Sequence, residues 1–172
     1  VPDRMIVYRD GGSDGSFDKI RDEEVPAVRE AICEMNRSGN RSCPNDCEKR
    51  NCEACAPKIT FVVAQKDHNM RIVPSDDREA VNGNVPSGTL VDGYITSYEG
   101  MDETFDFLLV PQGGLKGTSK PMHYRVILNE NAKPVVGHEG QSTPLTKEKF
   151  FEITYNMAFQ CTFESRVGAF SY

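Results

Sequence analysis

The sequence has no long hydrophobic run. Its longest apolar stretches, "ITFVVA" and "FLLVP", have the length of strands, whereas a membrane-spanning helix needs roughly 18 to 20 consecutive apolar residues. Basic residues are not in excess either, because 20 Lys and Arg stand against 26 Asp and Glu, for a net charge of −6. These absences predict a soluble protein without a membrane partner. They disfavour nucleic-acid binding by bulk electrostatics alone, although they are compatible with a local basic groove.

The sequence also lacks an even distribution of cysteine. Of its six cysteines, Cys33 and Cys161 lie in apolar helical patterns. The other four crowd into one polar segment, at Cys43, Cys47, Cys52 and Cys55. This asymmetry argues against a disulfide scaffold that spans the whole fold, and it favours a local staple or a metal site.

No internal repeat and no linker-like segment divides the chain. Its 172 residues, of which 38% are hydrophobic, can bury one ordinary core. We therefore expect one domain, or a large piece of one. The chain begins with "VPDR" rather than with Met and reaches a strand-like run within a few residues, so we expect the natural N-terminus to lie elsewhere.

Strand-like and helix-like segments can be placed along the chain by their periodicity. The run "KITFVVAQ" is continuously apolar at its centre, as expected of a strand covered on both faces. Helical spacing predicts two helices, at residues 16–36 and 146–163. Apolar and β-branched runs predict strands at residues 3–9, 58–65, 89–96, 104–112 and 122–128, with a further short strand following from 66–73. The order of these elements indicates a layered α/β domain.

The first predicted helix has a cap, an apolar face and a proline. Asp14 or Ser16 can cap its start, and Pro26 predicts a kink or a restart because it removes a backbone hydrogen bond. The predicted apolar face comprises Phe17, Ile20, Val28, Ile32 and Met35.

The second predicted helix starts at Thr146 and is followed by the end of the chain. Its predicted apolar stripe comprises Phe150, Ile153, Met157 and Cys161. Between the strands, "NENAK" predicts a turn.

Residues 36–57, "NRSGNRSCPNDCEKRNCEACAP", have no apolar periodicity and are interpreted as an inserted loop. The four cysteines follow the spacing Cys-x3-Cys-x4-Cys-x2-Cys, which can close around one tetrahedral zinc ion. The gap of four residues between the pairs is tight for a structural zinc site. One or two disulfides, or free cysteines in a flexible loop, are the alternatives.

Four segments are informative as an ordered set rather than singly: "IVYRDGGSDGSF", "ITFVVAQKDHNMR", "GNVPSGTLVD" and "FDFLLVPQGGLKGTSKPMHY". In this order and spacing they resemble the Piwi domain of Argonaute proteins, with its patterns "YRDGVSEGQF", "ITFIVVQKRHHTR", "GNVPPGTVVD" and "FYLxSHxGxQGTSRPxHYxV". The resemblance covers residues 1 to about 160, and the tail 161–172 diverges. It implies a partial ribonuclease-H-like α/β fold, with a mixed central sheet flanked by helices and a Cys-rich inserted loop.

The resemblance implies a role in small-RNA-guided gene silencing. The partners would be a guide RNA, a complementary target RNA and silencing-complex proteins, in the cytoplasm and also the nucleus. Cleavage in this family uses Mg²⁺ or Mn²⁺ held by carboxylates, and Asp10 matches the acid of "YRDG". The matching Asp, Glu and His of the family's catalytic set are not identifiable in this chain. Asp10 thus belongs to an incomplete metal site, and we expect no cleavage by residues 1–172 alone.

The family's nucleic-acid contacts are matched in part. Lys66, His68 and Arg71 fit the pattern after the central strand, whereas Asp67 and Asn69 stand where Arg and His are common. The second set of matching residues comprises Lys116, Thr118, Ser119, Lys120, His123 and Tyr124. Their hydroxyl, amide and ammonium groups suit sugar and phosphate contacts that do not depend on base sequence.

Each of these residues also has a plain structural interpretation. Asp10 can be a turn residue, and the cations can belong to an ordinary solvated surface. His68 can be a loop histidine, and His123 and Tyr124 can pack at a strand end.

Three functional hypotheses follow. The leading one is an RNA-binding piece of a Piwi domain. The second is a part of an active metal-dependent endonuclease whose other catalytic residues lie outside this chain. The third is a protein-interaction module with a zinc-binding insertion.

Overall fold

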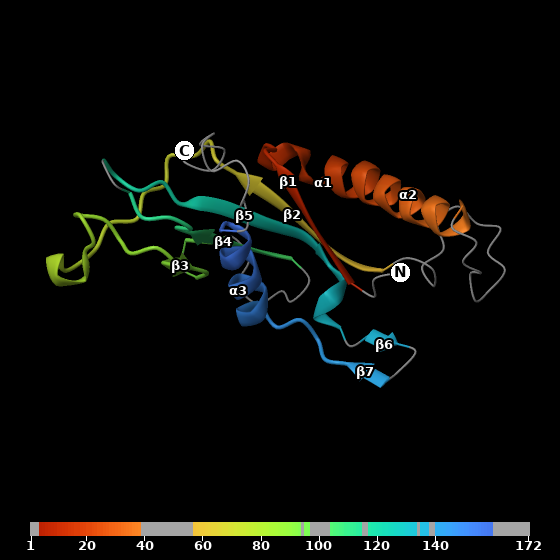
Figure 1. The fold of residues 1–172 in the computed structure, drawn as a ribbon. Coiled ribbons are helices and arrows are strands. Elements are labelled where there is room, and N and C mark those ends of the chain that lie inside the picture. Colours follow the sequence, from red (N-terminus) through yellow and green to blue (C-terminus); the bar gives the residue numbers. More distant parts are fainter. Residues whose placement is uncertain are drawn as a thin grey trace.

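A five-stranded sheet forms the centre of the molecule (Figure 1). The computed structural model describes residues 4–38, 57–93, 95–96, 104–114, 117–133, 135–137 and 140–159. The order of the strands is β1-β2-β5-β4-β3. β1 and β2 run parallel, and the other neighbouring pairs are antiparallel, so the sheet is mixed. The strands are β1 (Arg4–Asp10), β2 (Lys58–Gln65), β3 (Leu90–Val91), β4 (Phe105–Leu109) and β5 (Met122–Asn129).

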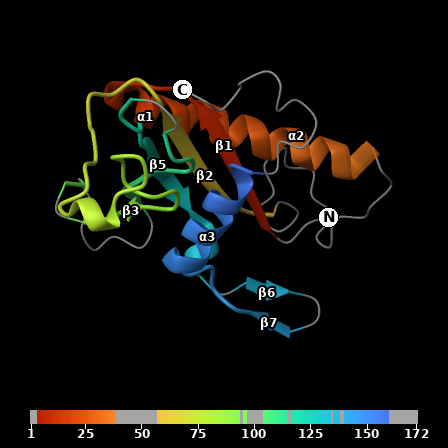
Figure 2. The same ribbon diagram turned by 60° about the vertical axis from the view of Figure 1, so that its left-hand side comes forward.

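Helices cover both faces of this sheet (Figures 1 and 2). One face carries α1 (Phe17–Lys19), a π-helical turn (Ile20–Glu24) and α2 (Val25–Ser38), and the other carries α3 (Lys147–Met157). Side chains of β2 alternate between the layers: Phe61 packs toward Phe17, and Val62 packs toward Phe150 of α3. The continuous apolar run of β2 is therefore explained by burial on both faces.

Two predicted strands are shorter than expected or absent. β3 has two residues, and the described segment 66–80 contains no strand. Polar groups of this segment form local hydrogen bonds instead of bonds to a neighbouring strand. The Arg71 guanidinium donates to the carbonyl of His68 at 3.2 Å, and the Met70 amide donates to the His68 ring at 3.2 Å. The prediction that "KDHNMRIV", residues 66–73, leads into a short strand is wrong for this reason.

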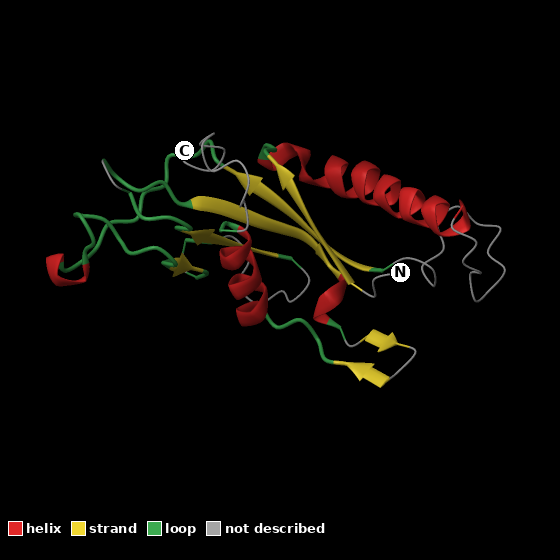
Figure 3. Ribbon diagram, viewed as in Figure 1, coloured by secondary structure: helices red, strands yellow, loops and turns green. Residues whose placement is uncertain are grey.

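A small hairpin lies away from the central sheet, and the sequence patterns did not predict it (Figure 3). It consists of β6 (Val135–Gly137) and β7 (Gly140–Ser142), which pair antiparallel. A 3-10 turn, Glu130–Ala132, precedes it and matches the predicted "NENAK" turn.

The π-helical turn changes which residues of the first helix are buried. The Val25 amide bonds to the Ile20 carbonyl, five residues back, so one extra residue is inserted ahead of Pro26. The chain thus passes Pro26 within a continuous helix rather than restarting there. Beyond the insertion the apolar face is shifted: Cys33 is 3% exposed and Met35 is 71% exposed. Placing Met35 on the buried face was therefore wrong.

The two helix starts differ in their caps. Thr146 caps α3 as predicted, because its hydroxyl accepts a hydrogen bond from the Lys149 amide at 3.3 Å. The predicted cap by Asp14 or Ser16 is absent at α1, which has no side-chain cap. The Ser16 hydroxyl instead donates to the Ser13 carbonyl at 2.7 Å.

The buried face of α3 also differs from the predicted stripe. Phe150 is buried as expected, but Met157 is 47% exposed, and the other buried residues are Phe151 and Thr154. Thr154 is tolerated inside because its hydroxyl donates to the Phe150 carbonyl at 2.9 Å and meets the Tyr8 hydroxyl at 2.8 Å. A buried polar residue of this kind is not visible in a pattern of apolar spacing.

Several predictions lie outside the described residues. These are the loop from residue 39 to 56 with its four cysteines, Cys161, and the tail 161–172. Among the helices that the structure does describe, none combines the length and apolarity needed to cross a bilayer.

Candidate nucleic-acid interface

Three strand ends meet at one edge of the central sheet, which we call the carboxyl edge: the carboxyl ends of β1 and β2 and the amino end of β5. Asp10 of β1 pairs in register with Ala64 of β2, and Gln65 of β2 pairs with His123 of β5. This topology gathers residues that are far apart in the sequence. Ligands of open α/β sheets bind outside the carboxyl ends of the parallel strands, so the carboxyl edge is the natural place for a site.

Asp10 presents its carboxylate to solvent at this edge. The side chain is 73% exposed, and Oδ2 lies 3.3 Å from Nζ of Lys66. An ion pair this exposed is worth about 0 to 1 kcal/mol, so a stronger ligand can replace Lys66. Carboxylate oxygens suit Mg²⁺, and Asp10 therefore fits as one ligand of such an ion. Within the described residues, no group of three or more His, Cys, Asp or Glu side chains is placed to hold a metal.

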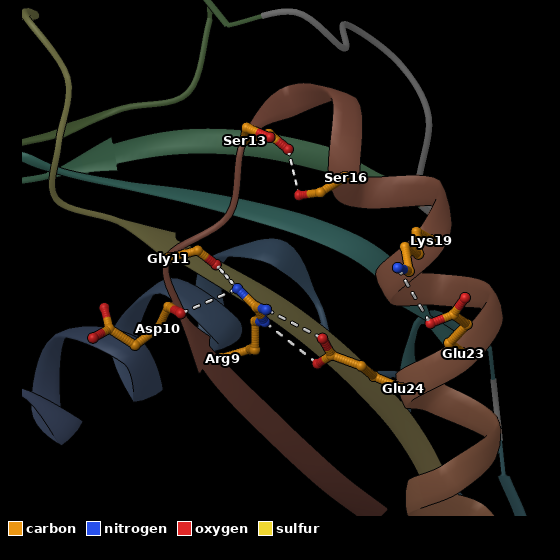
Figure 4. Close-up of polar contacts among 8 residues, drawn as sticks. All are labelled: Arg9, Asp10, Gly11, Ser13, Ser16, Lys19, Glu23 and Glu24. Carbon is orange, nitrogen blue, oxygen red and sulfur yellow. Dashed lines mark hydrogen bonds and ion pairs between the residues drawn. The ribbon is translucent and has the colours of Figure 1, made fainter.

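The turn that follows Asp10 is held by side chains from its surroundings (Figure 4). Gly11 and Gly12 have positive φ angles of 71° and 145°, which favour glycine. A Cβ on Gly12 would lie 3.2 Å from Cγ1 of Val63. The Arg9 guanidinium donates to the carbonyls of Asp10 and Gly11. The glycine-rich stretch is thus a fixed turn in this structure rather than a loose one.

His68 joins two of the segments predicted to bind nucleic acid. Its Nε2 lies 2.9 Å from the Pro121 carbonyl, and its Nδ1 accepts a hydrogen bond from the Met70 amide. This pattern requires a neutral ring with its proton on Nε2. Burial is the main cause that lowers the pKa of His68, and the charges of His123 and Arg71 act in the same direction. His68 is therefore a neutral link between the segments 66–71 and 117–121.

The predicted cations of these two segments and the hydroxyl of Thr118 lie at the surface. The side chain of Lys66 is 33% exposed, and Arg71, Thr118 and Lys120 are exposed. Arg71 bonds to two carbonyls of its own segment, at 3.2 and 2.7 Å. The remaining predicted residue of this kind, Lys116, lies outside the described residues.

Asn84 organises the second segment, and it was missed as a functional residue. It is 4% exposed; its Nδ2 donates to the Gly117 carbonyl and its Oδ1 accepts from the Ser119 amide, both at 2.8 Å. The buried Ser119 hydroxyl accepts from the Gly114 amide at 2.8 Å. Ser119 is thus committed to bonds inside the protein. The sequence signal is the "GNVPSG" motif, which contains Asn84.

Asp106 is the second missed residue. Its side chain is 3% exposed and its Oδ2 lies 2.8 Å from Nε2 of His123 and 3.5 Å from Nη1 of Arg125. The His123 ring also meets the His68 ring edge to face, with centroids 6.1 Å apart. His123 is therefore anchored from inside the sheet. A lone acid within the apolar strand "FDFLL" was the available signal.

Tyr124 packs in the core, which is the plain structural interpretation of this residue. It is 8% exposed, and its ring stacks on Phe107 with centroids 5.0 Å apart. Burial, together with the nearby Tyr8 hydroxyl, raises the pKa of Tyr124 to about 12. The buried ring is unavailable for stacking on a nucleic-acid base in this arrangement.

Comparison with known sequences yields a clear family. A model of the Piwi domain family matches residues 1–163. Protein argonaute 12 of Oryza sativa subsp. japonica is 37% identical over 132 residues, which cover 76% of this chain and 11% of that protein. Protein argonaute 5 of Arabidopsis thaliana is 35% identical over 135 residues, covering 76% of this chain and 12% of that protein. The chain thus spans about an eighth or less of the length of these relatives.

Solved structures agree with the sequence comparison. The crystal structure of Drosophila Piwi matches with a TM-score of 0.61 and 27% identity, over 92% of this chain and 17% of that one. The crystal structure of Kluyveromyces polysporus Argonaute with a guide RNA matches with a TM-score of 0.59 and 26% identity. That match covers 77% of this chain and 14% of the other.

The mixed five-stranded sheet with helices on both faces defines a ribonuclease-H-like α/β fold, as the resemblance implied. Within that class, the match over residues 1–163 and the identities of 35 and 37% decide the family. The chain belongs to the Piwi domain family, and its relatives are Argonaute proteins.

Proposed function

We propose that the protein to which this chain belongs acts in small-RNA-guided gene silencing, and that the carboxyl edge binds a guide RNA with its complementary target RNA. The observation that carries the proposal is the His68 to Pro121 hydrogen bond of 2.9 Å. It joins the two segments that present Lys66, Arg71 and Lys120. Membership of the Piwi family supports the proposal, as does the Kluyveromyces Argonaute, whose structure includes a guide RNA.

The chemistry of the two segments suits the sugar-phosphate backbone. Lys and Arg gain affinity by neutralising phosphates and releasing counterions, and a hydroxyl such as that of Thr118 can contact sugar or phosphate. None of these contacts depends on base sequence, so specificity would come from base pairing between guide and target. The exposed Asp67 and Asn69 lower the local density of positive charge. We therefore infer that the 66–71 segment contributes less affinity than a fully basic one.

We also propose that Asp10 supplies one carboxylate ligand of Mg²⁺ or Mn²⁺ in the complete protein. Bound divalent cations stabilise the attacking and leaving oxygens when a phosphodiester is cleaved. The side chain fits this role because it is 73% exposed and points away from the Arg9 guanidinium (Figure 4). The other ligands would come from outside residues 1–172, which by themselves would bind RNA without cleaving it. Silencing-complex proteins in the cytoplasm and nucleus are the proposed partners.

Guide-programmed cleavage tests both parts of the proposal. The full-length parent protein is loaded with a small guide RNA, and cleavage of a matched target is followed in Mg²⁺ for wild type and for Asp10→Ala. We expect both proteins to retain the guide and only wild type to cleave. Cleavage that survives Asp10→Ala would refute the role of Asp10. Failure of the wild-type protein to retain any guide would refute RNA binding.

A further inference from the structure

Arg9 and Asp10 are neighbours at the end of β1 and point to opposite faces of the sheet. Tyr8 packs in the layer of α3 and Val7 packs in the layer of α1 and α2, so strand alternation places Asp10 with the first and Arg9 with the second. Figure 4 shows the Asp10 carboxylate and the Arg9 guanidinium pointing apart. Arg9 therefore leaves the carboxylate of Asp10 accessible while it contacts the backbone beside it.

The Arg9 guanidinium uses its nitrogens on two targets at once. Nη1 donates to the carbonyl of Asp10 at 3.2 Å and to the carbonyl of Gly11. Nε and Nη2 donate to the two carboxylate oxygens of Glu24 at 3.3 and 3.2 Å. This planar fork cannot be reproduced by lysine, whose ammonium group acts as a point charge.

Other bonds complete the restraint of the turn at residues 10–12. The Gly11 amide donates to the Ala64 carbonyl at 2.8 Å, and Nε2 of Gln65 donates to the Gly12 carbonyl at 2.6 Å. The Asp10 carbonyl, both backbone polar groups of Gly11 and the Gly12 carbonyl thus all have partners. Glycine residues bring a large loss of conformational entropy on ordering, and these bonds offset that loss.

The π-helical turn places Glu24 where Arg9 can reach it. Glu24 follows Ile20 by four residues, a spacing that in an uninterrupted α-helix would place both side chains on the same buried face. The Val25 amide bonds to the Ile20 carbonyl instead, and Val25 takes the buried position with 4% exposure. Glu24 is rotated to the side of the helix, 41% exposed, where it meets Arg9. Single π turns of this kind are frequent at functional sites.

We infer that Arg9, anchored by Glu24, is a positioning residue that fixes the backbone of Asp10 so that its carboxylate can act as a metal ligand. This inference rests on the proposed function, because Asp10 needs a fixed backbone for this purpose only if its carboxylate binds a metal ion. A surface ion pair alone would stabilise the fold weakly. The additional bonds from the same guanidinium to the Asp10 turn distinguish this arrangement from such a pair.

The test compares Arg9→Lys with Arg21→Lys in the full-length parent protein. Arg21 lies on the same helical segment and pairs with Asp18 and Asp22 at 3.0 Å, so its replacement is a matched control. In guide-loaded protein, Arg9→Lys should raise the Mg²⁺ concentration for half-maximal cleavage about tenfold, the usual effect of losing an outer-shell partner. Guide affinity should be unchanged, and high Mg²⁺ should restore much of the rate.

A second readout does not depend on activity. Hydrogen exchange of the Gly11 amide should become about tenfold faster in Arg9→Lys and in Glu24→Gln, and stay at the wild-type rate in Arg21→Lys and Glu23→Gln. Equal exchange in all four variants would overturn the restraint. Faster exchange with an unchanged Mg²⁺ requirement, in a protein whose Asp10→Ala variant is inactive, would overturn the positioning role alone. A wild-type protein that neither cleaves RNA nor binds Mn²⁺ would instead refute the proposed metal function, and with it the purpose given to Arg9.

Discussion

Replacing Asn84 with alanine should release the segment that carries Thr118 and Lys120. The change removes two hydrogen bonds of 2.8 Å, to the Gly117 carbonyl and from the Ser119 amide, and a longer one of 3.3 Å to the Asn82 carbonyl. Each of the two shorter bonds contributes about 1 kcal/mol, and a buried amide left without an acceptor adds about 1 kcal/mol or more. The total is about 3 kcal/mol, which corresponds to a factor of roughly 100 in a local opening equilibrium.

Native-state hydrogen exchange of the Gly114 amide, which donates to the Ser119 hydroxyl and keeps that acceptor in the variant, measures this opening in the full-length protein. Asn84→Ala should accelerate its exchange roughly 100-fold. Asn84→Asp keeps the acceptor for Ser119 but sets a second acceptor against the Gly117 carbonyl, so its effect should be smaller, about tenfold. The control is Asn156→Ala, since Asn156 is exposed on α3. An Asn84→Ala rate within a factor of about three of wild type would refute this account of how the segment is held.

Three further predictions concern other residues. Gly114→Ala should also loosen the 117–121 segment, because a Cβ would lie 2.9 Å from the Ser119 hydroxyl; exchange of the Ser119 amide reports it, and a wild-type rate would contradict it. The lowered pKa of His68 means that the unfolded chain binds more protons, so stability falls as the pH drops below about 6.5. The protection factor of the Met70 amide, which is its intrinsic exchange rate divided by its observed rate, should fall as the pH drops below about 6.5 in wild type and stay constant in His68→Gln. The cysteine spacing predicts about one zinc ion per chain, and elemental analysis under reducing conditions should show one equivalent fewer in Cys52→Ser/Cys55→Ser; equal zinc content would exclude the site.

The apolar strands were predictable from the sequence because their environment is simple. β2 and β4 are buried on both faces, so their runs need no knowledge of partners. The segment 66–73 does not lead into a strand as expected, and one of its amides, that of Met70, is satisfied locally by the His68 ring. The hairpin of β6 and β7 has three residues in each strand, too few for a periodic signal.

The candidate site was only partly predictable, since its geometry depends on register. The sequence singled out Asp10 and Lys66, but their separation of 3.3 Å follows from the pairing of β1 with β2. Polar residues inside the fold, such as Asp106 and Asn84, carry no periodic signal and were missed. The role of Glu24 depends on a one-residue π insertion, which apolar spacing alone did not predict. Beyond it, Val28 packs against the core as expected, whereas Met35 was wrongly placed on the buried face.

RNA binding at the carboxyl edge is tested most directly by the salt dependence of guide affinity. For single-stranded RNA, each phosphate contact contributes about 0.7 to the slope of log affinity against log salt. In the full-length protein, replacing Lys66, Arg71 and Lys120 together by alanine should therefore reduce that slope by about 2. Replacing the exposed Lys19 and Lys149 should leave it unchanged. Equal slopes for wild type and the triple variant would contradict the proposed interface.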